Sequence, residues 1–209
     1  MKNYFNVLIW PIIFLIGQIF ILVALSLILL LINPNIDIAN YLNNNSYIVS
    51  IISLIIFLPL FIKQYSKYKD KYKGKLKDIP KIIIIGIILS LILNINIFKL
   101  NPNSNEPNFN IFYLINIVII GPILEEYLFR GIVYNRLLEF NDETKSYIIA
   151  VVIFALFHTG GIFNVIYAFI MGLILNKLYI KQKTLKSSIL FHIVINATAS
   201  IIFPLLLSL

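Results

Sequence analysis

The chain has 209 residues, of which 60% are hydrophobic and 12% are charged, and its mean hydropathy is +0.92. This composition excludes an ordinary soluble domain and predicts a single membrane domain over residues 1–209. The net charge of +8 would suit a nucleic-acid partner, but the lysines lie beside apolar segments. We therefore expect no nucleic acid, and anionic lipids of the bilayer at the basic loops instead. The absence of cysteine excludes disulfides and thiolate catalysis.

Three apolar segments predict membrane helices in the N-terminal half of the chain, over residues 7–32, 47–62 and 82–98. The first segment is too long for the apolar region of a signal peptide and no small-residue cleavage site follows it, so we interpret it as a retained helix. A polar loop without Lys or Arg follows at 33–46, whereas residues 63–81 carry eight lysines. We expect residues 1–110 to form a set of N-terminal transmembrane helices.

The C-terminal half predicts four further apolar helices, over residues 111–138, 147–157, 162–175 and 187–207. Gly121-Pro122 predicts a kink in the first of them. The two middle helices are short for full spans, so we expect the turn that joins them, at residues 158–161, to lie within the membrane under a cover of protein or water. The expected fold class is an all-α polytopic transmembrane bundle with about six to eight membrane helices.

The distribution of charge predicts an orientation. All but two of the 17 Lys and Arg residues lie at the N-terminus or on alternate connections between spans, and the exceptions are Lys99 and Arg130. By the positive-inside rule the N-terminus and these basic connections face the cytoplasm, as in a multi-pass protein of the cell membrane. At about 1.5 Å per helical residue, the polar residues of the later spans lie in the cytoplasmic half of a core about 30 Å thick.

Charged residues within the fourth span are the first functional signal. Glu125, Glu126 and Arg130 lie where each charge costs about 2.5–3.5 kcal/mol on insertion scales. Glu126 and Arg130 are four residues apart, so on a helix they share a face and form an ion pair, which is either purely structural or supports a site. Glu125 lies about 100° away around the helix and has no local partner.

The chain has two histidines, His158 and His192, and Asn196 follows the second by four residues. Each alone is typical of a polar residue that joins membrane helices by a hydrogen bond. At a depth that matches Glu125, the set predicts a hydrolytic site in which Glu125 and a histidine activate water and His192 with Asn196 stabilises the oxyanion. Two Glu and two His would also suit a metal, but the H-E-x-x-H spacing is absent, so we expect no metal and no other cofactor.

These residues resemble three motifs of the CAAX prenyl protease/bacteriocin-processing family (CPBP, also called Abi): Glu125-Glu126-x-x-x-Arg130, Phe154-x-x-x-His158 and His192-x-x-x-Asn196. The resemblance covers about residues 110–205, with the motifs in the order and spacing of the family. It implies that residues 111–207 are the catalytic core of a metal-independent intramembrane glutamic endopeptidase. It also implies that Glu125 and His158 activate water, that His192 and Asn196 donate to the oxyanion, and that Glu126 and Arg130 form a supporting pair.

The resemblance implies a membrane-embedded peptide or protein as substrate, because eukaryotic members trim prenylated C-terminal tails. Bacterial relatives are linked to bacteriocin self-immunity, peptide maturation or signalling, so the alternative is a non-catalytic immunity or sensor-interacting protein of the same family. A small transporter that uses the polar cluster as an ion path is a third possibility, which the absence of inverted repeats disfavours. The sequence leaves the oligomeric state open.

Overall fold

The computed structural model describes residues 2–100, 109–158 and 161–207, and this part of the chain is helical with no strand. Residues 101–108 of the expected polar loop, and Thr159 and Gly160 of the expected turn, lie outside the described residues. The N-terminal half comprises α1 (Lys2–Ile32), α2 (Ile38–Asn44), α3 (Tyr47–Tyr65), the 3₁₀ helix η1 (Ser66–Lys71) and α4 (Ile79–Leu100). The C-terminal half comprises α5 (Ile111–Ile115), η2 (Asn116–Ile120), α6 (Gly121–Glu125), η3 (Glu126–Tyr134), α7 (Asn135–Leu137), α8 (Glu143–Leu156), α9 (Ile162–Gln182), α10 (Leu185–Ala197), η4 (Thr198–Ile202) and α11 (Phe203–Leu207).

Within the described ranges, six helical segments are long and apolar enough to cross a membrane: Tyr4–Ile32, Tyr47–Lys69, Ile79–Asn96, Ile111–Leu137, Ile162–Gln182 and Leu185–Leu207. The predicted all-α polytopic bundle is therefore confirmed. The 14 residues of α8 extend about 21 Å, which is short for a span, as predicted. The prediction that the next helix is also short is wrong, because α9 continues to Gln182. Asn176 does not end it, since this side chain is buried and hydrogen-bonded inside the bundle.

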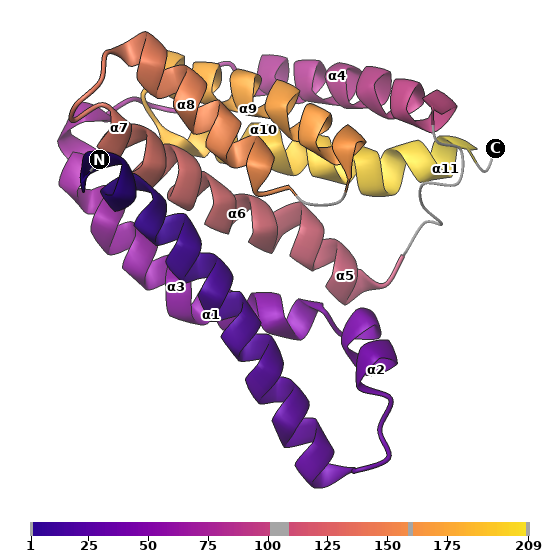
Figure 1. Ribbon diagram of the computed structural model, residues 1–209. Helices are drawn as coiled ribbons and strands as arrows, with labels where there is room; N and C mark the ends of the chain where they lie inside the picture. Colours follow the sequence, from indigo (N-terminus) through magenta and orange to yellow (C-terminus); the bar gives the residue numbers. More distant parts are fainter. Residues whose placement is uncertain (1, 101–108, 159–160, 208–209) are drawn as a thin grey trace.

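The segments from α5 to α7 form one continuous rod through the middle of the molecule (Figure 1). On one side α1 and α3 pack against each other. Helix α3 follows the rod as far as α5, where Tyr47 stacks on Phe112, whereas the far end of α1 diverges from the rod toward α2. On the other side lie α8, α9, α10 and α4. The pair α8–α9 makes the most extensive helix contact, and α10 packs between α9 and α4. The rod therefore separates an N-terminal helix pair from a C-terminal bundle.

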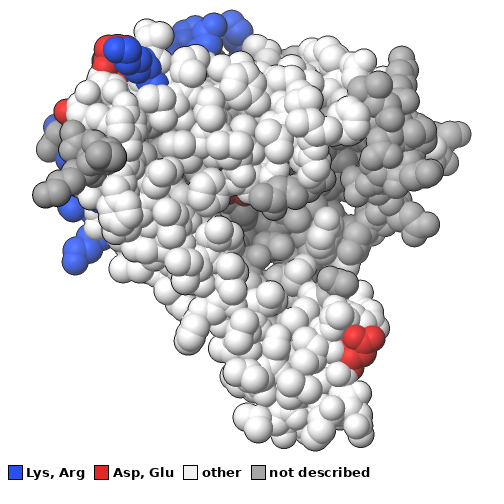
Figure 2. Space-filling model, viewed as in Figure 1, with Lys and Arg blue, Asp and Glu red and all other residues white. Residues whose placement is uncertain are grey.

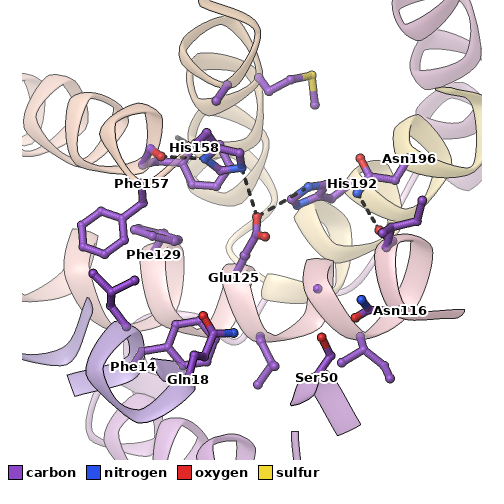
Figure 3. A pocket seen from close by; sticks show the side chains of 18 of the residues that line it. Phe14, Gln18, Ser50, Asn116, Glu125, Phe129, Phe157, His158, His192 and Asn196 are labelled. Carbon is purple, nitrogen blue, oxygen red and sulfur yellow. Dashed lines mark hydrogen bonds and ion pairs between the residues drawn. The ribbon is translucent and has the colours of Figure 1, made fainter. Parts of the chain in front are cut away.

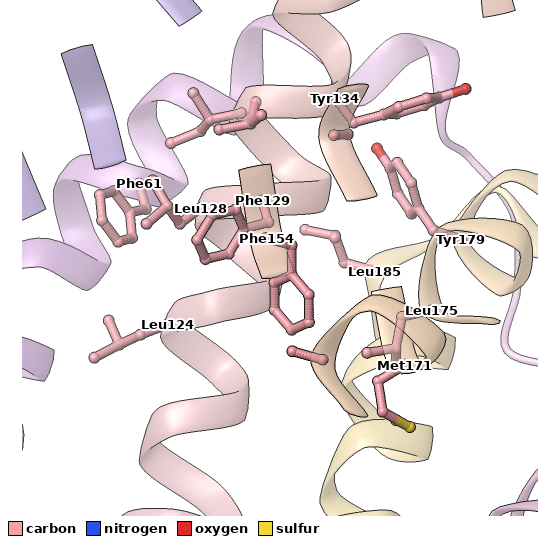
Figure 4. Packing of buried hydrophobic residues seen from close by; sticks show 14 of the residues in the cluster. Phe61, Leu124, Leu128, Phe129, Tyr134, Phe154, Met171, Leu175, Tyr179 and Leu185 are labelled. Carbon is pink, nitrogen blue, oxygen red and sulfur yellow. The ribbon is translucent and has the colours of Figure 1, made fainter. Parts of the chain in front are cut away.

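The buried core surrounds η3 and joins it to both sides of the molecule (Figure 4). Leu128 and Ile132 are completely buried there. Helix α8 approaches α9 closely at Gly172, where a Cβ atom would lie 3.2 Å from the side chains of Phe154 and Val151. This approach places Phe154, and with it the end of α8, against the middle of the bundle.

Lys and Arg side chains gather at the end of the molecule that holds the N-terminus, and most of the remaining visible surface is uncharged (Figure 2). Much of that surface is apolar, as on α1, where Phe20 is 72% exposed and Leu31 is 85% exposed. Water would penalise so much exposed hydrocarbon, whereas lipid tails accept it. Helix α8 begins at this charged end, and Asp142 is its N-cap: the Asp142 side chain accepts a hydrogen bond from the backbone N–H of Lys145. This hydrogen bond lowers the pKa of Asp142.

We expect cysteine labelling to report the orientation, because the chain has no cysteine of its own. In intact cells, Ala39→Cys on exposed α2 should react with a membrane-impermeant maleimide, whereas Lys71→Cys at the end of η1 should be protected until the membrane is permeabilised. The measurement is the labelled fraction before and after permeabilisation. The reverse pattern would show that the N-terminus lies outside the cytoplasm.

Candidate active site

Glu125 is the last residue of a short α-helical stretch that lies between two π-helical stretches, η2 and η3. Pro122 explains the first irregularity, because proline has no N–H to donate to the helix ladder. The N–H of Gly121 donates instead to the carbonyl of Asn116, five residues earlier. Isolated π turns are frequent at functional sites because they redirect side chains. The kink predicted at Gly121-Pro122 thus corresponds to a change in hydrogen-bond register.

This change in register leaves the carbonyl of Ile117 without its usual partners. The backbone nitrogen four residues later is that of Gly121, which donates to Asn116, and the nitrogen five residues later is that of Pro122. The side chain of Asn196 on α10 supplies the donor, with Nδ2 at 2.8 Å from the Ile117 oxygen. An amide group has two N–H bonds, so Asn196 keeps one for another partner. The hydrogen bond fixes where that second N–H lies.

A buried ion pair follows Glu125. Arg130 Nη1 donates to Glu126 Oε1 at 2.8 Å, and both residues are 0% exposed. Arg130 Nε donates to Asn176 Oδ1 of α9 at 3.0 Å, and its guanidinium lies 4.2 Å from the centre of the Phe154 ring. Since a buried charge is tolerated only when it is paired and hydrogen-bonded, this one group binds α8 and α9 to η3.

Both histidines are oriented through their Nδ1 atoms. His158 Nδ1 lies 2.9 Å from the carbonyl oxygen of Phe154, one turn earlier at the end of α8. His192 Nδ1 lies 2.9 Å from Glu126 Oε1, the oxygen that also accepts from Arg130. Because a carbonyl and an ion-paired carboxylate both act as acceptors, each Nδ1 carries hydrogen. The Nε2 atom of each ring is left to face Glu125.

Glu125 Oε2 is the meeting point of the two rings, at 3.6 Å from His158 Nε2 and 3.9 Å from His192 Nε2. These distances exceed those of direct hydrogen bonds. In neutral rings both Nε2 atoms would present lone pairs to a carboxylate oxygen, and acceptors that face one another repel. The arrangement is favourable only with a proton or a water molecule between Glu125 and a histidine. Glu126 is neutralised by Arg130, so Glu125 is the carboxylate left for proton transfer.

These groups line a cavity of about 460 Å³ (Figure 3). Glu125 projects into it from the rod, His158 reaches it from the end of α8, and His192 and Asn196 reach it from α10. The cavity is also hollowed into the visible surface between the α1–α3 pair and the rest of the molecule (Figure 2). The structure thus brings the four residues predicted as catalytic to one cavity.

Among the described residues no group of three or more His, Cys, Asp or Glu has the geometry to hold a metal ion.

Residues 107–198 match the family model described as type II CAAX prenyl endopeptidase Rce1-like. All three motifs lie in this segment. This segment is therefore similar to the CPBP (Abi) family. The chain is also 37% identical over 98 residues to the "UPF0177 protein in abiGi 5'region" of Lactococcus lactis subsp. cremoris. That alignment covers 47% of this chain and 41% of the relative, so the chain spans about two-fifths of the relative's length. No solved structure matches it significantly.

The CPBP motifs omit several polar residues that the structure brings to the site. Asn176 accepts a hydrogen bond from Arg130. The sequence feature that could have identified it is an Asn within an apolar helix. Gln18 of α1, Ser50 of α3 and Asn116 of η2 line the cavity, and their side chains have no hydrogen bond within the described residues. Gln18 and Ser50 lie outside the matched segment, so only the folded chain reveals that the N-terminal helices complete the cavity.

Removing Arg130 should destabilise the fold. Arg130→Ala leaves Glu126 buried without its charge partner, which costs about 3–5 kcal/mol, so folded protein in the membrane and thermal stability in detergent should both fall. Lys145→Ala is the control, because its pair with Asp142 is 3.4 Å long with side chains 72% and 56% exposed and is worth about 0–1 kcal/mol. Equal stability of the two variants would contradict a structural role for the buried pair.

Asn196→Ala should also lower stability, because the Ile117 carbonyl would lose the donor that replaces its backbone partners. An unsatisfied buried polar group costs about 1–3 kcal/mol. Asn96→Ala is the matched control, since exposed Asn96 donates to the Ile92 carbonyl of its own helix and water can replace it. Thermal unfolding in detergent measures the difference. A melting temperature as high as that of Asn96→Ala would exclude this role of Asn196.

Proposed function

We propose that the chain is an intramembrane endopeptidase that hydrolyses a peptide bond of a membrane-embedded peptide or protein. The observation that carries the proposal is the position of Glu125 Oε2, within 3.6 and 3.9 Å of the Nε2 atoms of His158 and His192 at the wall of a cavity. A carboxylate and imidazoles at this spacing suit general acid–base catalysis with one water molecule. The match to the CAAX prenyl endopeptidase model supports the same reaction class.

In the proposed reaction Glu125 takes a proton from water, and the water oxygen attacks the carbonyl carbon of the substrate. The C–N bond then breaks, and the proton passes through the Glu125–His158 pair to the leaving amine. The products are a carboxylate and an amine. The Nδ1 hydrogen bond to Phe154 keeps His158 Nε2 turned toward Glu125 throughout. Each step uses side chains of the chain itself, so we propose that no cofactor takes part.

The oxyanion formed during attack would lie between Asn196 and His192. Asn196 can donate its second N–H, because the first is held by Ile117. The hydrogen bond between His192 Nδ1 and Glu126 fixes the ring, so that Nε2 can donate whenever it also carries hydrogen. Hydrogen-bond donors that are fixed before the reaction are the most effective ones for a developing charge. In this proposal Glu126 and Arg130 support the site without touching the substrate.

We place this site in the cytoplasmic half of the cell membrane, with the N-terminus in the cytoplasm, because of the one-sided distribution of Lys and Arg. The alternative function is non-catalytic immunity or contact with a sensor protein. The name of the Lactococcus relative describes no activity. Binding without catalysis is therefore the second candidate function of the same cavity. The two functions differ in whether they need a carboxylate at position 125.

Glu125→Gln separates them, because glutamine keeps the shape and hydrogen bonds of the side chain but takes up no proton. We expect proteolysis by the purified variant to fall by about 10²–10⁴-fold, as for a lost general base. The measurement is cleavage of membrane-inserted peptides in liposomes, with and without a prenylated C-terminal tail, followed by mass spectrometry. Glu143→Gln at the exposed start of α8 is the control and should remain active.

Two outcomes would contradict the proposal. If Glu125→Gln protects cells or signals as well as the unchanged chain, the cavity acts by binding. If a strong chelator abolishes cleavage and zinc restores it, Glu125 and the histidines are metal ligands. We expect cleavage to continue in excess chelator, since a water activated by Glu125 needs no Lewis acid.

A further inference from the structure

Two basic segments that are about a hundred residues apart in the chain are joined into one surface. The Gly74 N–H donates to the Lys183 carbonyl at 2.9 Å. The side chain of Gln182 pairs with the backbone of Lys77, accepting from its N–H at 3.0 Å and donating to its carbonyl at 3.1 Å. A Cβ atom on Gly74 would overlap the Gln182 carbonyl oxygen, so this approach needs glycine. The loop before α4 is thus fixed to the end of α9.

A second cavity of about 520 Å³ lies at this junction. Exposed lysines surround it: Lys75, Lys77, Lys81, Lys177, Lys181 and Lys183. Asp78 is its single acidic residue. In the part of the chain that the structure describes, none of these six lysines forms an ion pair. The cavity therefore concentrates positive charge, with six lysines against one aspartate in its lining.

The backbone at this cavity is also unusual. Asp78 and Lys183 are the two non-glycine residues with positive φ among those described, at 55° and 51°, and both line the cavity. A non-glycine residue in the left-handed region is uncommon and costs free energy, and such residues cluster at ligand sites and turns. Lys183 ends α9 and Asp78 precedes α4. Both strained residues thus lie where a lysine-bearing segment meets a helix end at the cavity.

The cavity also has an apolar part. Helices α4 and α9 both pack on α10, and apolar side chains of all three helices line the cavity: Ile82, Ile85, Ile174, Leu178 and Phe191. Ile85 is 45% exposed although it lies one turn inside a membrane span. A cationic rim above an apolar groove matches a molecule that carries an anionic head and a hydrocarbon tail.

We propose that this cavity is a binding site for one anionic phospholipid. The headgroup phosphate contacts the lysines of both segments, and an acyl chain lies in the groove between α4 and α9. Basic pockets between transmembrane helices bind anionic headgroups for this electrostatic reason. A nucleic acid would use the lysines but leave the apolar groove empty. The site is separate from the Glu125 cavity and does not depend on the proposed peptidase activity.

Native mass spectrometry of the purified protein in detergent tests the proposal. Titration with dioleoyl phosphatidylglycerol should show one lipid that binds at least about tenfold more tightly than dioleoyl phosphatidylcholine. The double variant Lys81→Gln/Lys177→Gln removes one lysine from each wall and should lose this preference. Lys63→Gln/Lys145→Gln removes the same charge from exposed positions outside the cavity and should retain it.

Four results would overturn the proposal. Equal loss in both double variants would show that only net charge matters. Displacement of the lipid by glycerol 1-phosphate at an equal concentration would show a site for soluble anions that makes no use of the apolar groove. No preference between the two lipids in the unchanged protein would show that there is no anionic-lipid site. A duplex oligonucleotide that displaces the lipid would identify the lysines as a nucleic-acid surface.

Discussion

The structure depends on neutralising one buried guanidinium. Arg130 is completely enclosed in an apolar bundle, where an unpaired charge would be costly. Its partners come from three elements: Glu126 on its own helix, Asn176 on α9 and the Phe154 ring on α8. Through Glu126 the network also reaches His192 on α10. The helices that carry Glu125, His158 and His192 are thus held together by the contacts that satisfy Arg130 and Glu126.

The two adjacent carboxylates acquire different roles from this constraint. Glu126 points into the bundle and shares one oxygen between Arg130 and His192. Glu125 points into the cavity, keeps 28% of its side chain exposed and lies near the Nε2 atoms of both histidines. Residues next to each other on a helix project in directions about 100° apart, so a pair of glutamates supplies one buried anchor and one carboxylate at the cavity. A single glutamate would have to serve both purposes.

The sequence predicted the helical class, the approximate spans and the convergence of three polar segments, because apolar length and the cost of intramembrane charge are local properties. It did not predict the register change around Pro122, since an i,i+5 hydrogen bond leaves no mark in hydrophobic periodicity. For the same reason the bond from Asn196 to Ile117 was not foreseen. Asn176 was placed beyond the end of its helix, because a polar residue ends an apolar run unless a buried partner holds it.

The N-terminal helices supply part of the cavity wall that the motifs do not describe. Glu125, His158, His192 and Asn196 line one side of the cavity, whereas Gln18 and Ser50 line it from α1 and α3, outside residues 107–198. Polar side chains that make no hydrogen bond to another described residue can bind an extended peptide, whose own N–H and C=O groups must be satisfied within a membrane. Chains that share the motifs but differ in these two helices would present a different wall to the same Glu, His and Asn side chains. Under the proposed peptidase function, differences in substrate would then arise from α1 and α3.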